Sequence, residues 1–164
     1  MASIGHVAVG LCFSRVHAAG AWRWKAAAAW SVLSLSPDLD VLAFALGIPY
    51  ASPWGHRGFT HSITFALLVG AAIGLSVRDR KTGILAMLTV LSHPLLDSLT
   101  NGGLGVALFW PLTDARYFAP WQPIPVSPIG RAFFSARGLT VATAEVWMLL
   151  PAWLYALWPR KITA

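Results

Sequence analysis

Most side chains of this sequence that could bind a metal ion lie in four short clusters. One is the run W-G-H-R-G-F-T-H-S at residues 54–62, which places two imidazoles just before a long apolar stretch. The others are a histidine near the amino terminus, two aspartates in S-P-D-L-D and a pair in S-H-P-L-L-D. The six candidate ligands are His6, Asp40, His56, His61, His93 and Asp97. A combination of imidazole and carboxylate ligands suits zinc, with manganese or iron as alternatives. These residues could hold one or two ions.

The pair His93 and Asp97 has the best-defined geometry. Residues four apart on a helix emerge one turn apart on the same face, so both side chains can bind one ion. A carboxylate in an apolar helix is costly without a partner, which favours a metal, an arginine or a hydrated cavity beside Asp97. Pro94 removes one backbone hydrogen bond and can open the helix there. The leading ligand candidates are His61, His93 and Asp97, followed by His6 and Asp40.

Asp38 and Arg57 are the candidate catalytic residues. An aspartate that does not bind the metal can act as a general base or hold a ligand histidine in place, and we assign this role to Asp38. The guanidinium of Arg57 matches the geometry of a phosphate or another anion. Simpler roles remain open, because Asp38 could cap a helix and Arg57 could anchor to lipid headgroups or pair with His56 in an ordinary loop.

A single histidine in an apolar helix is more often a hydrogen-bonded core residue than a metal ligand. His17 has no carboxylate nearby in the sequence, so we expect it to be non-functional. The joint pattern argues for a shared site, since three of only 6 acidic residues, Asp38, Asp40 and Asp97, belong to the clusters.

The composition indicates a membrane protein. The chain of 164 residues is 57% apolar and only 11% charged, with 9 Trp, whereas soluble domains carry roughly 25% charged residues. The net charge of +6 could suggest a nucleic-acid partner. The basic residues are scattered in twos and threes between apolar runs, which fits anchoring beside a membrane and argues against nucleic acid. The lone Cys12 excludes an internal disulfide.

The predicted fold is an all-α integral membrane bundle that forms one domain over residues 1–164. We expect about three full transmembrane spans together with shorter helices, and a Pro-rich, aromatic loop that suits the headgroup level. The spans are 59–77, 83–99 and 139–158, the shorter helices are 3–18, 26–35 and 36–46, and the loop is 104–138. Residues 4–13, followed by V-H-A-A-G-A at 16–21, could also pass for a signal peptide with its cleavage site. No Lys or Arg precedes them, so a retained helix is favoured.

Charge predicts the orientation of this multi-pass protein. If the segments alternate across the membrane, eight of the 12 basic residues fall on one side, which the positive-inside rule makes cytoplasmic. These eight are Arg15, Arg23, Lys25, Arg78, Arg80, Lys81, Arg160 and Lys161. The candidate metal ligands then gather near the opposite, periplasmic face. The reversed topology stays open.

Five short motifs carry a resemblance that covers nearly the whole chain. They are G-H at 5–6, P-D-L-D at 37–40, H-R-G-x-T-H-S at 56–62, S-H-x-x-x-D at 92–97 and F-W-P at 109–111. The sequence resembles the YdjM-type family of predicted membrane-bound, metal-dependent hydrolases of bacterial inner membranes. The resemblance implies metal-dependent hydrolysis at the inner membrane, but it implies no particular substrate.

A fainter similarity is to the zinc-dependent phospholipase C and P1 nuclease group. The order of ligands in that group, His, Asp, His and then His-x-x-x-Asp, is similar to the order here. The later ligands of the group have no counterpart, because no histidine follows His93. One metal ion, or at most two, is what these residues support.

The sequence thus predicts a membrane-bound hydrolase of phosphoester or ester bonds that uses metal-activated water. A site at the membrane face favours a lipid or lipid-linked phosphoester as substrate. Two other classes remain open, a metal-binding channel or transporter and a membrane scaffold in which a metal joins short helices. The sequence specifies neither the metal nor the oligomeric state.

Overall fold

The computed structural model describes residues 3–17 and 24–159, and its regular secondary structure is helical. Its elements are α1 (Ser3–His17), α2 (Trp24–Leu35), η1 (Ser36–Leu46), η2 (Phe59–His61), α3 (Ile63–Val77), α4 (Arg80–Ser98), η3 (Gly130–Phe134), α5 (Ala136–Met148) and α6 (Leu150–Leu157), where η marks a 3₁₀ helix. Within these residues the only β pairing is two isolated bridges, Thr100 with Ile124 and Val106 with Tyr117. The predicted all-α class is confirmed.

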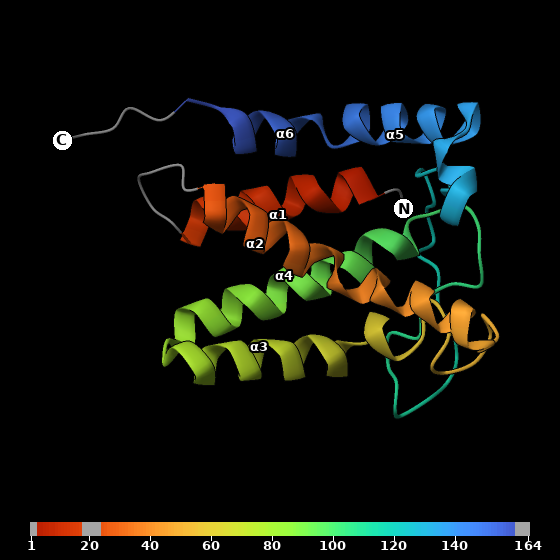
Figure 1. Ribbon diagram of the computed structural model, residues 1–164, viewed down its shortest axis with the longest axis horizontal. Helices are drawn as coiled ribbons and strands as arrows, with labels where there is room; N and C mark the ends of the chain where they lie inside the picture. The colour runs from red at the N-terminus through yellow and green to blue at the C-terminus, as the bar shows by residue number, and fades with distance from the viewer. Residues whose placement is uncertain (1–2, 18–23, 160–164) are drawn as a thin grey trace.

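The long helices run along the long axis of the molecule (Figure 1). Helix α4 packs against α3, α2 and α1, while α5 and α6 cover the other side of α1. The end of α1, the start of α2 and the α3–α4 turn lie at one end of the molecule. η1, η2 and most of the 99–135 segment lie at the other. The basic α3–α4 turn is therefore remote from the sequence clusters that carry the candidate ligands.

The interior is unusual because its largest fully buried side chains are polar. His6, His61, His93 and Glu145 head that group, while the buried apolar residues are mostly alanines. Large apolar side chains instead face outward, and Phe134 is 88% exposed. In membrane proteins, ionisable side chains face the bundle interior and apolar ones face lipid. This distribution therefore suits a lipid environment.

The prediction of about three full spans is not confirmed. One helix among the described residues is long and apolar enough to cross a membrane, the 23-residue stretch Trp24–Leu46, with a mean hydropathy of 1.3. There α2 continues into η1 instead of ending at Leu35 as we expected. Pro37 does not interrupt it, since it lies in the first turn of η1.

Each predicted span differs from the structure for a local reason. Segment 59–77 is divided, because residues 59–61 form η2 and the Ser62 hydroxyl caps α3 by accepting the Phe65 N–H. Segment 139–158 is bent by 70° between α5 and α6, so at most the bent pair makes a second span. Segment 83–99 belongs to α4, whose ends carry Arg80, Lys81 and Asp97.

The 3₁₀ helix η1 presents three faces because it has three residues per turn. Residues three apart lie above one another, so each face repeats every third position. Pro37, Asp40 and Ala43 are buried, Leu39 and Leu42 point outward, and Asp38, Val41 and Phe44 line a cavity. The tight helical pitch thus directs the two aspartates of S-P-D-L-D to different sides.

Glycines allow α3 and α4 to pack closely as a hairpin. A Cβ at Gly70 would lie 2.5 Å from Met87 Cβ and 2.8 Å from the Gly83 carbonyl oxygen. A Cβ at Gly83 would lie 2.9 Å from Gly74 Cα. The helices therefore touch through their backbones at this crossing, which fixes the position of α4 and of the ligands near its end.

We expect Gly70→Val to destabilise the protein by about 1–3 kcal/mol, because the added methyl groups must push α3 away from α4. Thermal unfolding in detergent measures the effect. The matched control is Ala72→Val, which adds a similar volume at an exposed position of the same helix. Equal melting temperatures for the two variants would contradict close packing at Gly70.

Candidate metal centre

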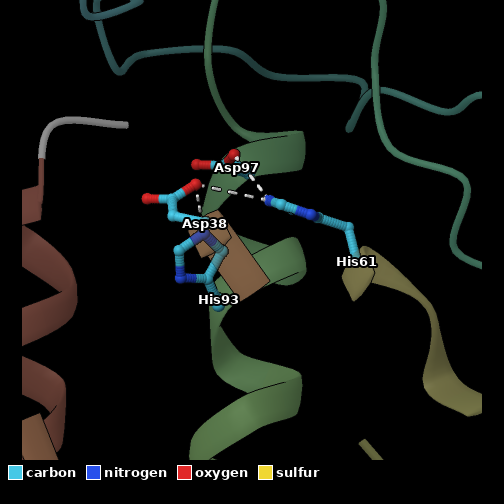
Figure 2. A group of neighbouring side chains, drawn as sticks. All are labelled: Asp38, His61, His93 and Asp97. Carbon is cyan, nitrogen blue, oxygen red and sulfur yellow. Dashed lines mark ion pairs between the residues drawn. The ribbon is translucent and has the colours of Figure 1, made fainter. Parts of the chain in front are cut away.

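Four side chains from three elements point toward one another at the end of α4 (Figure 2). They are Asp38 from η1, His61 from η2, and His93 and Asp97 from α4. His93 Nε2 lies 3.2 Å from Asp38 Oδ1, and His61 Nε2 lies 3.7 Å from the same oxygen. His61 Nε2 is also 3.6 Å from Asp97 Oδ2. The sequence clusters near 38, 61 and 95 therefore meet at one point.

These separations fit an ion better than direct hydrogen bonds. Ligand atoms at about 2.0–2.1 Å from a tetrahedral zinc lie roughly 3.3–3.4 Å apart. The three nitrogen-to-oxygen distances here are 3.2, 3.6 and 3.7 Å. His61 Nε2 and His93 Nε2 are buried and accept or donate no hydrogen bond among the described residues. Because such orphaned polar atoms are rare in protein interiors, a cation between them fits the donor set.

The second ring nitrogen of each histidine is held by an acceptor. His93 Nδ1 donates to the Ser34 carbonyl oxygen at 2.8 Å, which leaves Nε2 facing the centre. His61 Nδ1 lies 3.0 Å from Asp40 Oδ2. Metal-binding histidines commonly have this support from a carbonyl or carboxylate, which fixes the tautomer and the ring orientation. Both imidazoles are thus oriented as ligands would be.

Asp40 lies behind His61 and both its oxygens have hydrogen-bond partners. His56 Nδ1 lies 2.7 Å from Oδ1. The Arg57 backbone N–H and the Thr60 hydroxyl donate to Oδ2 at 3.0 and 2.7 Å. Asp40, His56 and His61 are close enough to form a second potential metal group. Since Asp40 already receives these bonds, the structure gives it and His56 a supporting position, whereas Asp38 converges with His61, His93 and Asp97.

His6 lies beside the four residues but not among them. Its ring stacks on His93 with centroids 3.5 Å apart, and its Nε2 is 3.4 Å from Asp97 Oδ1. Burial, followed by repulsion from His93, lowers the pKa of His6 to about 3, so the ring is neutral. The neutral ring of His6 thus packs against His93 and faces the second oxygen of Asp97.

Arg57 is held inside the site by its backbone and its side chain. It adopts a left-handed backbone conformation with φ of 62°. The guanidinium is buried, with Nε 2.9 Å from Asp97 Oδ2 and Nη1 donating to the Gly102 carbonyl at 2.9 Å. Arg57 Nε is close enough for an ion pair but is not aligned for a hydrogen bond. The residue therefore orients Asp97 and also lines the adjoining cavity.

The carboxylates create a field that favours positive charge. Burial opposes protonation of His61, but the nearby carboxylates of Asp38, Asp40 and Asp97 outweigh it and raise the pKa of His61 to about 10. The surroundings that stabilise a proton on this ring also attract a divalent cation, which would replace the proton. The electrostatics of the site are therefore those of a cation-binding centre.

A cavity of about 550 Å³ reaches the site from the side of Asp38. Asp38 has a 25% exposed side chain, whereas His61, His93 and Asp97 are at most 1% exposed. The walls are mainly apolar and come from η1 and from the 126–134 segment around η3. Asp38 is thus the member of the four that a molecule in the cavity would meet first.

Three supporting groups were not identified from the sequence. The Ser34 carbonyl accepts from His93, and Arg116 donates to the carbonyl oxygens of Tyr50, Ser52 and His56 at 2.9–3.0 Å. Buried Glu145 accepts the Gly5 N–H at 3.1 Å, beside His6. Of these groups, only Glu145 could have been suspected from the sequence, because it is an acidic residue within an apolar stretch.

Comparison with known proteins places the chain in a family. The sequence profile of the YdjM inner membrane protein family matches residues 1–162. The chain belongs to the YdjM inner membrane protein family. The inner membrane protein YbcI of Escherichia coli (strain K12) is 39% identical over 168 residues, which cover 96% of this chain and 97% of that protein. No solved structure matches the chain significantly.

Membership in the YdjM family supports a location in the bacterial inner membrane. It agrees with the outward-facing apolar side chains. The names of the family and of the relative state no activity. The similarity to the phospholipase C group, the metal and the periplasmic orientation stay predictions.

We expect the purified protein to contain a divalent metal and the His93→Ala variant to contain none. The Asp40→Asn variant should bind the metal about 10–100-fold more weakly, because Asp40 supports His61. Elemental analysis and competition with a chelator measure both. The control is His17→Ala, since His17 is exposed and contacts Thr82 at the other end of the molecule. Unchanged metal content in His93→Ala would contradict the centre.

Proposed function

We propose that this YdjM family member is a membrane-bound, metal-dependent hydrolase that cleaves a lipid or lipid-linked phosphoester. The observation that carries the proposal is the meeting of two buried, unpartnered imidazole nitrogens with two carboxylates beside a cavity. The orphaned nitrogens support a metal, and the open side at Asp38 supports access for a substrate.

We assign the metal to His61, His93 and Asp97, the three fully buried members of the group. A divalent ion held there supplies an activated water by lowering its pKa toward about 7. Asp38 borders both the group and the cavity, so its carboxylate is positioned to accept a proton as general base. Asp40 orients His61, and Arg57 holds Asp97 in place.

The cavity supports an amphipathic substrate. Asp38, His56 and Arg57 form its polar part, while side chains such as Val41, Phe44 and Phe133 make its apolar walls. A phosphoester group would lie at the polar end beside the metal, and the attached hydrocarbon would lie against the walls. The outward face of η1, with Leu39 and Leu42, is also apolar and suits contact with lipid beside the cavity.

One observation favours a second function, a metal-binding membrane scaffold without turnover. If Asp38 binds the ion together with the other three residues, the coordination shell has four protein ligands. Closed four-ligand shells are typical of structural zinc sites, whereas catalytic sites keep one position for water. The role of Asp38 therefore separates the two functions.

We expect Asp38→Asn to lower hydrolysis at least about 100-fold while metal content stays unchanged, since a general base contributes typically 10²–10⁴-fold. Fluorescent phosphomonoester, phosphodiester and acyl-ester lipids in mixed micelles would serve as substrates, with metal content measured on the same samples. The control Asp114→Asn neutralises a carboxylate outside the site and should leave both values unchanged.

The outcomes distinguish the alternatives. Loss of metal in Asp38→Asn, with wild-type protein inactive on all three lipid classes, would support the scaffold. A wild-type protein that retains no divalent metal after gentle purification would remove the basis of both functions.

A further inference from the structure

A second feature suited to ligand binding lies on the outer surface of the α3–α4 hairpin, far from the metal centre. A groove of about 650 Å³ follows the crossing of the two helices. Its lining includes Gly70, Gly74 and Gly83 where the two helices are in close contact, and Leu67 and Leu75 stand beside it and are 53% and 79% exposed. The groove is therefore an apolar channel with open sides.

The groove ends at two arginines. Arg78 closes α3 in a left-handed conformation with φ of 54°, and Arg80 begins α4. Both side chains are exposed, and neither guanidinium makes an ion pair or hydrogen bond with the described residues. The carboxylate between them, Asp79, is occupied as the cap of α4, accepting the backbone N–H groups of Lys81 and Thr82. The end of the channel is thus cationic.

We propose that this groove binds one anionic phospholipid, with the headgroup phosphate at Arg78 and Arg80 and an acyl chain along the glycine crossing. Guanidinium groups match phosphate geometry, and basic residues at a membrane surface attract anionic lipids. Gly70 to Arg78 spans about 12 Å of helix, which gives the chain an apolar bed next to the charge. Family membership supports a location in a bacterial inner membrane, where phospholipids surround the protein.

Charge disfavours a second copy of the chain as the occupant. Two copies inserted with the same orientation would bring their α3–α4 turns to the same depth. Arg78 and Arg80 of one copy would then face the same arginines of the other, and like charges repel. An anionic lipid instead complements both the arginines and the apolar walls.

The lipid site is separate from the metal centre. Gly83 and Asp97 lie 14 residues apart on α4, or about 21 Å along the helix. The two features occupy opposite ends of the hairpin (Figure 1). Binding at the groove can therefore be tested without any assumption about hydrolysis.

The test titrates phosphatidylglycerol, or phosphatidylcholine with the same acyl chains, onto delipidated protein in neutral detergent and counts bound lipid by native mass spectrometry. We expect one phosphatidylglycerol per chain, bound about tenfold more tightly than phosphatidylcholine. The double variant Arg78→Gln/Arg80→Gln should remove this preference. Lys25→Gln/Lys81→Gln loses the same charge outside the groove lining and should keep it.

A second pair of variants tests the channel itself. Ala71→Trp places a large ring in the groove, whereas Ala72→Trp adds it at the next exposed position, which does not line the groove. Only Ala71→Trp should weaken phosphatidylglycerol binding, and metal content should not change in either. Equal binding of the two lipids, equal effects of the matched variants, or a dimer that Ala71→Trp dissociates would each overturn the proposal.

Discussion

The structure depends on the burial of imidazole and carboxylate groups among helices that have few other large core residues. A buried charge is costly unless it is paired or bound to a metal. Asp38, Asp40 and Asp97 therefore need polar or cationic neighbours, and the imidazoles of His61 and His93 and the guanidinium of Arg57 lie beside them. This mutual requirement joins η1, η2 and α4, which would otherwise meet mainly through alanines.

The exterior follows from the same arrangement. Because the interior is occupied by polar side chains, leucine and phenylalanine are left to face outward, where a bilayer can solvate them. The elements include two 3₁₀ segments, η1 and η2, and a 70° bend between α5 and α6, so the protein does not resemble a set of regular spans. Irregular backbone in a membrane is tolerated where it is enclosed by protein or lines a cavity. The 3₁₀ helix η1 lines the cavity along one of its faces, and His61 of η2 is buried.

The sequence was informative where a feature depended on residue type and local spacing. The helical fold followed from composition, and the proximity of His93 to Asp97 followed from their separation of four residues. The different directions of the Asp38 and Asp40 side chains could not be predicted, since they depend on the 3₁₀ pitch of η1. The bend between α5 and α6 and the partners of Arg116 depend on tertiary packing, which leaves no local signal.

The three-residue repeat of η1 has a consequence for how this segment tolerates change. In an ordinary helix, deleting one residue rotates everything beyond it by about 100°. In η1 the rotation is about 120°, which moves a side chain from one of the three helix faces to the next. Deleting one residue between Asp38 and Asp40 would move every later residue of η1 to a neighbouring face of the helix. Leu42, which points outward, would then take the cavity-lining position of Val41. Shortening or lengthening this stretch by three residues would preserve every side-chain direction, so natural length variation here should come in threes.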